Sequence, residues 1–166
     1  MSITLSQKER MLLEDQKSHE QLCIEKYSNY ASQTNDAQLK QIFNANRQTE
    51  QEHLNSINQL LSGQIPQMNQ QQGGQQQSVN AQATQNLANN MNQNAQPSGM
   101  ENVSDKDMCS DLLMTEKYVS GTYDTAIFEF RDPNVRSVLN HIQKEEQEHG
   151  EAIYKYMESK GLYNIQ

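Results

Sequence analysis

The tetrapeptide Glu50-Gln51-Glu52-His53 occurs a second time, unchanged, as Glu146-Gln147-Glu148-His149. The two copies lie 96 residues apart, and the same shift, made without gaps, aligns further polar and apolar residues in the two halves of the chain. The aligned pairs include Asp15 with Asp111, Glu20 with Glu116, Tyr27 with Tyr123, Leu39 with Val135, and Ile57 with Ile153. Agreement over such a length indicates an internal duplication.

Each half predicts two helices, because apolar residues recur at steps of three and four and no alternating pattern competes. Ser6 and Glu9 have the spacing of a capping box, and Asp132 followed by Pro133 suits the start of the last helix. We expect helices at about 7–31 and 37–61, then from after residue 104 to about 131, and from 133 to a stop at residue 161. The first hairpin then covers about residues 6–62 and the second 104–163.

The segment between the hairpins, residues 63–103, is rich in Gln and Asn and carries one charged residue, Glu101. So few apolar side chains cannot offset the entropy of ordering, and we expect a flexible linker. A chain of 166 residues suits one hydrophobic core. The sequence therefore predicts an all-α fold, with residues 1–166 forming a single four-helix domain whose linker is a long crossover.

Composition excludes several classes of function. A net charge of −8 with mixed signs along the chain disfavours nucleic acid as a partner. No stretch approaches the roughly 18 apolar residues that a membrane span needs, so we expect no membrane span. Cys23 and Cys109 lie far apart without a paired motif, which favours neither a disulfide framework nor a cysteine zinc site.

Four glutamates and two histidines have a spacing that brings them to one level of the bundle. Glu20 and Glu50 are equally far from the first predicted turn, so they lie side by side in an antiparallel hairpin. Glu116 and Glu146 repeat this arrangement about the second turn. Each Glu-x-x-His unit places its two side chains on one helix face, and that face is the apolar one. The six side chains should point inward, where unpaired charge is costly.

One Glu from each of two helices and one Glu-x-x-His from each of the other two form the ligand set of a carboxylate-bridged dinuclear metal site. This set resembles that of ferritins, rubrerythrins and manganese catalases, which hold two iron or manganese ions in a ferritin-like bundle. Carboxylate and imidazole ligands suit these two metals. The resemblance implies two iron or manganese ions held by Glu20, Glu50, His53, Glu116, Glu146 and His149.

A longer match in sequence covers residues 107–163. It includes the runs Leu112-Leu113-Met114-Thr115-Glu116-Lys117-Tyr118, Asp132-Pro133-Asn134-Val135-Arg136, Glu145-Glu146-Gln147-Glu148-His149 and Lys160-Gly161-Leu162-Tyr163. These runs resemble the spore coat F family of endospore-forming bacteria. The resemblance implies a sporulation protein, synthesised in the cytoplasm of the mother cell and located in the spore coat. Its partners would be other coat proteins or further copies of itself, and catalysis is not implied.

Three functions stay open at this point. The first is a structural coat protein with a buried dinuclear metal site, or with the same fold after loss of the metal. The second is a di-iron or di-manganese oxidoreductase that consumes peroxide, similar to manganese catalase or rubrerythrin, and uses the same six residues. The third is an adaptor that assembles through the Gln/Asn-rich linker and exposed tyrosines.

Several residues near the six have two interpretations. Tyr27 and Tyr123 follow Glu20 and Glu116 by two helical turns, so they either fill the core or hydrogen-bond to a ligand. A buried Cys23 one turn from Glu20 is more often a packing residue than a ligand. We expect His19 and His141 to lie at the surface or boundary of the bundle. We expect Glu145 and Glu148 to face solvent.

Overall fold

Side-chain caps begin each of the four helices of the fold. The computed structural model describes residues 3–67 and 103–163, and in these residues the helices are α1 (Gln7–Gln33), α2 (Ala37–Leu61), α3 (Asp105–Glu129) and α4 (Pro133–Ser159). Ser6 and Glu9 form the predicted capping box, since the Ser6 hydroxyl accepts from the Glu9 amide and the Glu9 carboxylate accepts from the Ser6 amide. Asp132 caps α4, with Pro133 in its first turn as expected.

One glycine follows the second helix of each hairpin. Gly63 follows α2 with a φ of 83°, and Gly161 follows α4 with a φ of 67°. Positive φ is strained for residues with a Cβ, which explains why glycine stands at both helix ends. The amide of Leu162 donates to the carbonyl of Met157 over 2.8 Å, closing the last turn of α4. The predicted helix boundaries are confirmed to within about two residues.

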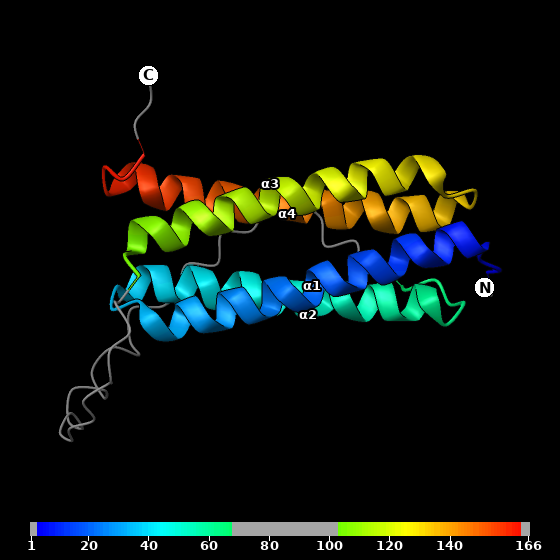
Figure 1. Cartoon of the computed structure of the whole chain (residues 1–166), viewed down its shortest axis with the longest axis horizontal. Coiled ribbons are helices and arrows are strands. Elements are labelled where there is room, and N and C mark those ends of the chain that lie inside the picture. The colour runs from blue at the N-terminus through cyan, green and yellow to red at the C-terminus, as the bar shows by residue number, and fades with distance from the viewer. Residues whose placement is uncertain (1–2, 68–102, 164–166) are drawn as a thin grey trace. The chain divides into compact units, whose positions relative to one another are not determined.

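The four helices form two antiparallel hairpins, α1 with α2 and α3 with α4 (Figure 1). Within the described residues, α1 packs against α3 and α2 against α4, so the hairpins lie face to face. The predicted all-helical four-helix architecture is confirmed. The assignment to a ferritin-like fold, the internal duplication and the single domain stay predictions, and most of the predicted linker, residues 68–102, lies outside the described residues.

Polar contacts hold the two hairpins together at both ends. The Arg131 guanidinium, beside the α3–α4 turn, donates to the Glu9 carboxylate over 3.0 Å. At the opposite end Lys160, after α4, donates to Asp36 at the α1–α2 turn over 3.0 Å. The turn of each hairpin is therefore bound to the other hairpin.

The buried face of each helix changes from apolar to polar and back again. In α1 the fully buried series runs through Leu13, Glu20 and Tyr27. Around Tyr27, at the end of the bundle near the α1–α2 turn, an apolar cluster seals the interior. Its members include Tyr27, Phe43, Met108, Leu112, Ile153, Tyr156 and Met157. The glutamates therefore lie inside the bundle, beyond a sealed apolar end. Within the described residues, no helix is long and apolar enough to cross a membrane.

Candidate metal centre

Six side chains from four helices meet inside the bundle at the level that the sequence predicts. They are Glu20 of α1, Glu50 and His53 of α2, Glu116 of α3, and Glu146 and His149 of α4, and none is more than 5% exposed. Their ligand atoms form two groups of four, each with all its atoms within 4.8 Å of one another. Glu50 and Glu146 belong to both groups, so the groups share an edge made of two carboxylates.

The first group is centred on His53. Its Nδ1 atom lies 3.2 Å from Glu50 Oε2, 3.1 Å from Glu146 Oε1 and 3.5 Å from Glu20 Oε2. These carboxylates come from α1, α2 and α4, so both hairpins contribute. One buried imidazole nitrogen therefore faces three buried carboxylates.

The second group is centred on His149. Its Nδ1 atom lies 3.2 Å from Glu50 Oε1 and 3.7 Å from both Glu116 Oε2 and Glu146 Oε2. The rings of His53 and His149 are stacked at a centroid distance of 5.7 Å. The two groups are thus adjacent and repeat one pattern. Each contains a Glu from the first helix and a His from the second helix of one hairpin, and both contain the carboxylates of Glu50 and Glu146.

Seven buried atoms of the cluster lack a hydrogen-bond partner. They are Glu20 Oε2, Glu50 Oε1, Glu116 Oε2, both carboxylate oxygens of Glu146, and both ring nitrogens of His149. Some of them lie close to an opposite charge, as Glu50 Oε1 does to His149, but without the angles of a hydrogen bond. Buried polar atoms are nearly always paired, because leaving one unpaired costs about 1–3 kcal/mol. Apart from His149 Nε2, on the far side of a ring whose Nδ1 faces the carboxylates, these atoms belong to residues of the two groups. Such oxygen and nitrogen atoms are the donor set of a metal pair, so the residues fit such a pair.

Burial and mutual repulsion shift the protonation of the cluster. Burial raises the pKa of Glu20 well above its usual value and raises the pKa of Glu116 to about 8. Burial would also raise the pKa of Glu146, but contacts with His149 and His53 lower it below the usual range. Burial opposes the charged form of His149, yet Glu116, Glu146 and Glu50 raise its pKa to about 11. Without metal, protons therefore provide the positive charge that balances these carboxylates, and binding of cations would release them.

Tyr27 and Tyr123, two helical turns beyond Glu20 and Glu116, are buried and also donate hydrogen bonds to the cluster. The Tyr27 hydroxyl of α1 donates to Glu116 Oε1 of α3, and the Tyr123 hydroxyl of α3 donates to Glu20 Oε1 of α1. Each tyrosine thus orients the glutamate of the other hairpin rather than the one in its own helix. Asn46 Nδ2 donates to the Tyr27 hydroxyl over 3.1 Å, whereas the matching position beside Tyr123 holds the apolar Ile142.

Glu145 was expected to face solvent, and that expectation is wrong. Its carboxylate Oε2 accepts from His53 Nε2 over 2.9 Å, and its side chain is 28% exposed. A carboxylate at the outer nitrogen fixes the ring so that Nδ1 faces the cluster. The 96-residue shift aligns Glu145 with Thr49, whose hydroxyl donates to the Ala45 carbonyl of its own helix. The signal for Glu145 is its position next to Glu146, since the adjacent residue of α4 faces the neighbouring helix α2.

Other candidates lie outside the two groups. Cys23 is fully buried one turn from Glu20, and burial among carboxylates raises its thiol pKa, so the thiol is held neutral. His19 stacks edge-on against Tyr118 between α1 and α3. His141 is 45% exposed and reaches the outer carboxylate Glu145 at 3.3 Å. The expectation that both histidines lie at the surface or boundary is confirmed.

Comparison with known families matches residues 104–166 to the Coat F domain. The chain contains a Coat F domain. This domain comprises α3 and α4, and it contributes Glu116, Glu146 and His149 to the cluster. The other three members come from α1 and α2, which lie outside the matched residues. No curated protein and no solved structure matches the chain.

The Coat F domain also carries the contacts that cross to the first hairpin. In this domain Tyr123 donates to Glu20, and Arg131 donates to Glu9. Glu145 accepts from His53. The polar cluster is therefore not a property of the domain alone, because half of its members and several of their hydrogen-bond partners belong to residues 7–61.

Proposed function

We propose that this chain is a spore coat or sporulation-associated protein whose single ferritin-like domain, residues 1–166, holds two iron or manganese ions. The Coat F domain supports the coat role. Synthesis in the cytoplasm of the mother cell, location in the spore coat and assembly with other coat proteins or with itself belong to the same proposal. Its two hairpins would be products of one duplication.

In this proposal Glu50 and Glu146, which belong to both groups, would help to hold both ions. Glu20 and His53 complete one position, while Glu116 and His149 complete the other, as in the two overlapping groups. The observation that carries the proposal is the set of buried carboxylate and imidazole atoms in the two groups that lack hydrogen-bond partners. A structural bundle without metal would gain stability by replacing such groups with apolar side chains.

A bound metal pair would tie the two hairpins together. The shared carboxylates come from α2 and α4, so each ion would be bound by residues of both hairpins. Any ligand that binds the native state alone stabilises it by about RT ln(1 + [L]/Kd), roughly 2.7 kcal/mol at a hundredfold excess over Kd. Such stabilisation suits a protein that must persist in a coat.

The test compares the parent with Glu50→Ala/Glu146→Ala. Elemental analysis of untagged protein should give two metal ions per parent chain and far fewer in the variant. Iron or manganese should raise the melting temperature of the parent and leave that of the variant unchanged. Without metal the variant should be equally stable or slightly more stable, because two buried carboxylates are gone. A parent that melts at the same temperature with and without either metal would reject the metal pair.

A peroxide-consuming oxidoreductase is the second candidate function. The observation that favours it is the hydrogen bonding of two oxidisable phenols, Tyr27 and Tyr123, to proposed metal ligands. Two iron or manganese ions would supply redox chemistry with peroxide. The assay is peroxide consumption by the metal-loaded parent and by Glu50→Ala/Glu146→Ala. Equal rates in the two proteins would exclude an enzymatic role for this site.

A further inference from the structure

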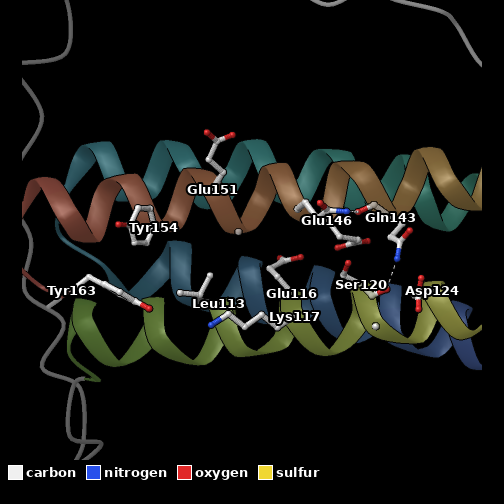
Figure 2. A pocket seen from close by; sticks show the side chains of 13 residues that line it. Leu113, Glu116, Lys117, Ser120, Asp124, Gln143, Glu146, Glu151, Tyr154 and Tyr163 are labelled. Atoms are coloured by element: carbon white, nitrogen blue, oxygen red, sulfur yellow. Dashed lines mark hydrogen bonds between the residues drawn. The ribbon is translucent and has the colours of Figure 1, made fainter. Parts of the chain in front are cut away.

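A groove of about 620 Å³ runs between α3 and α4 and reaches the metal centre from one side (Figure 2). Glu116 and Glu146 lie in the middle of this groove, between Tyr154 at one end and Asp124 at the other. Both glutamates are almost fully buried, and three of their four carboxylate oxygens have no hydrogen-bond partner. The groove thus brings the surface of the bundle close to unpaired ligand atoms.

Gly150 leaves this groove open. A Cβ atom at this position would lie 3.6 Å from Leu113 Cδ1 and 3.9 Å from Glu116 Cβ, which are ordinary contacts. The backbone there has no positive φ, so neither sterics nor conformation requires glycine. Glycine inside a helix costs about 0.5–1 kcal/mol relative to alanine. What the glycine provides is space beside Glu116.

The first hairpin is built differently at the matching positions. The 96-residue shift aligns Leu54 with Gly150 and Ile24 with Ser120 in sequence. Both aliphatic side chains are half-buried. Two large apolar groups on α1 and α2 thus replace a glycine and a serine on α3 and α4. At these positions of the described residues, only the α3–α4 side has small side chains next to the centre.

The walls of the groove favour cations. Asp124 and Glu151 are exposed along it, Glu116 and Glu146 lie deep within it, and Lys117 is its one cationic lining residue among the described residues. Glu151 also pairs with Lys155 at 2.6 Å, an exposed contact that screens part of its charge. A cleft lined mainly by one sign of charge concentrates the opposite ion and accelerates its arrival.

We propose that the groove between α3 and α4 is the route by which divalent metal cations reach Glu116 and Glu146, with Gly150 keeping it open. This inference rests on the proposed metal pair. Cations arrive at the rim near Glu151 and pass Gly150 to the two deep carboxylates, while Asp124 adds negative charge at the other end of the groove.

The experiment measures the rate at which metal-free, full-length protein takes up Mn²⁺, followed by loss of the electron paramagnetic resonance signal of aqueous Mn²⁺. Gly150→Leu should slow uptake at least tenfold and reach the same final stoichiometry as the parent. Gly150→Ala is the matched control, because it makes the same change in helix propensity but adds one methyl group in ordinary contact. Its uptake rate should stay within about twofold of the parent.

If the parent binds no Mn²⁺, uptake is measured with Fe²⁺ instead, and a parent that binds neither ion rejects the proposed metal pair itself. A parent that binds Mn²⁺, with Gly150→Leu loading equally fast, keeps the metal pair and overturns the route. These two failures are therefore distinguishable.

A second variant decides the matter if Gly150→Leu does not fold. Asp124→Asn/Glu151→Gln should slow Mn²⁺ uptake several-fold at low salt, and the difference from the parent should fade as salt is added. Glu25→Gln/Glu52→Gln makes the same change in net charge at exposed positions of α1 and α2 and should leave the rate unchanged. Equal rates for the two double variants would overturn the route.

Discussion

Tyr27 and Tyr123 occupy matching positions but have different surroundings, and the difference predicts unequal effects on stability. Replacing Tyr27 with Phe leaves Glu116 Oε1 and Asn46 Nδ2 without their partner. Replacing Tyr123 with Phe orphans only Glu20 Oε1, because Ile142 stands where a second polar group would be. In metal-free protein we expect Tyr27→Phe to lower the free energy of unfolding by roughly 2–3 kcal/mol and Tyr123→Phe by about 1–2 kcal/mol.

Denaturant unfolding of the two variants and the parent measures this difference directly. Tyr30→Phe serves as a control for loss of a phenol from α1, since its hydroxyl bonds to the half-buried Asp111. Equal losses from Tyr27→Phe and Tyr123→Phe would mean that Asn46 contributes nothing to the cluster.

Glu145 orients His53, and its charge should matter for metal affinity. Glu145→Gln retains an acceptor of the same shape but loses the carboxylate that holds the outer ring nitrogen. We expect metal affinity to fall about tenfold while the stoichiometry of two is retained. Competition with a metallochromic chelator measures the affinity. Glu148→Gln, an exposed change in the same helix, is the control, and equal affinities for both variants would remove Glu145 from the centre.

At the scale of the helix, the start of α1 depends on one charged contact. The Arg131 guanidinium beside Glu9 lowers the pKa of this carboxyl from 4.5 to about 2. Because the folded pKa lies below the unfolded one, the contact stabilises the fold above about pH 4.5, and the benefit is lost as pH falls toward 2. Glu9→Gln keeps the capping-box acceptor and removes the charge.

We therefore expect Glu9→Gln to be about 2 kcal/mol less stable than the parent at pH 7, with the two proteins converging near pH 2. Urea unfolding across this pH range is the measurement, with Glu14→Gln as an exposed control on the same helix. A constant difference at all pH values would show that the loss is not one of charge.

The helices and the inward position of the six residues could be predicted because both depend on local rules. Caps such as Ser6 and Asp132 mark helix starts, and Glu-x-x-His spacing places two side chains on one face. The contact of Glu145 with His53 could not be predicted, because it depends on how α4 lies against α2. Periodicity within one helix gives a face but not the neighbouring helix that the face meets.

The same limit applies to the tyrosines and to the groove. The sequence places Tyr27 two turns from Glu20, yet its hydroxyl reaches Glu116 of the other hairpin. The rotation and offset between the hairpins decide which glutamate lies closer to the Tyr27 hydroxyl. Residue spacing within one helix predicts neither quantity. Gly150 likewise looks like any helical glycine until Leu113 and Glu116 are seen beside it.

At the scale of the whole molecule, the ends of α2 and α3 that the crossover joins lie at opposite ends of the bundle. Glu9 at the start of α1 lies beside Arg131, while Lys160 lies beside Asp36, which sets the direction of each helix. A connection must therefore span roughly 37 Å, the length of a 25-residue helix.

Deleting Gln67 to Gln96 leaves residues 62–66 and 97–104, 13 residues, between α2 and α3. Fully extended, they reach roughly 43 Å, enough for this span, so the bundle should melt within several degrees of the parent. Loop length enters stability weakly, at roughly 0.6 kcal/mol per doubling. Differential scanning calorimetry measures the effect, and a variant with the deleted length replaced by Gly and Ser controls for reach. A lower melting temperature in that control as well would assign the deleted residues to the core.

The crossed bonds from Tyr27 to Glu116 and from Tyr123 to Glu20 have the reciprocity of an isologous interface, in which residue i meets j and j meets i. Here both partners of each bond belong to one polypeptide. A substitution in one hairpin therefore acts on the other, because loss of a phenol from the first hairpin removes a hydrogen bond to a glutamate of the second. Among relatives, position 27 should therefore covary with 116 and position 123 with 20, rather than each with the residue two turns away in its own helix.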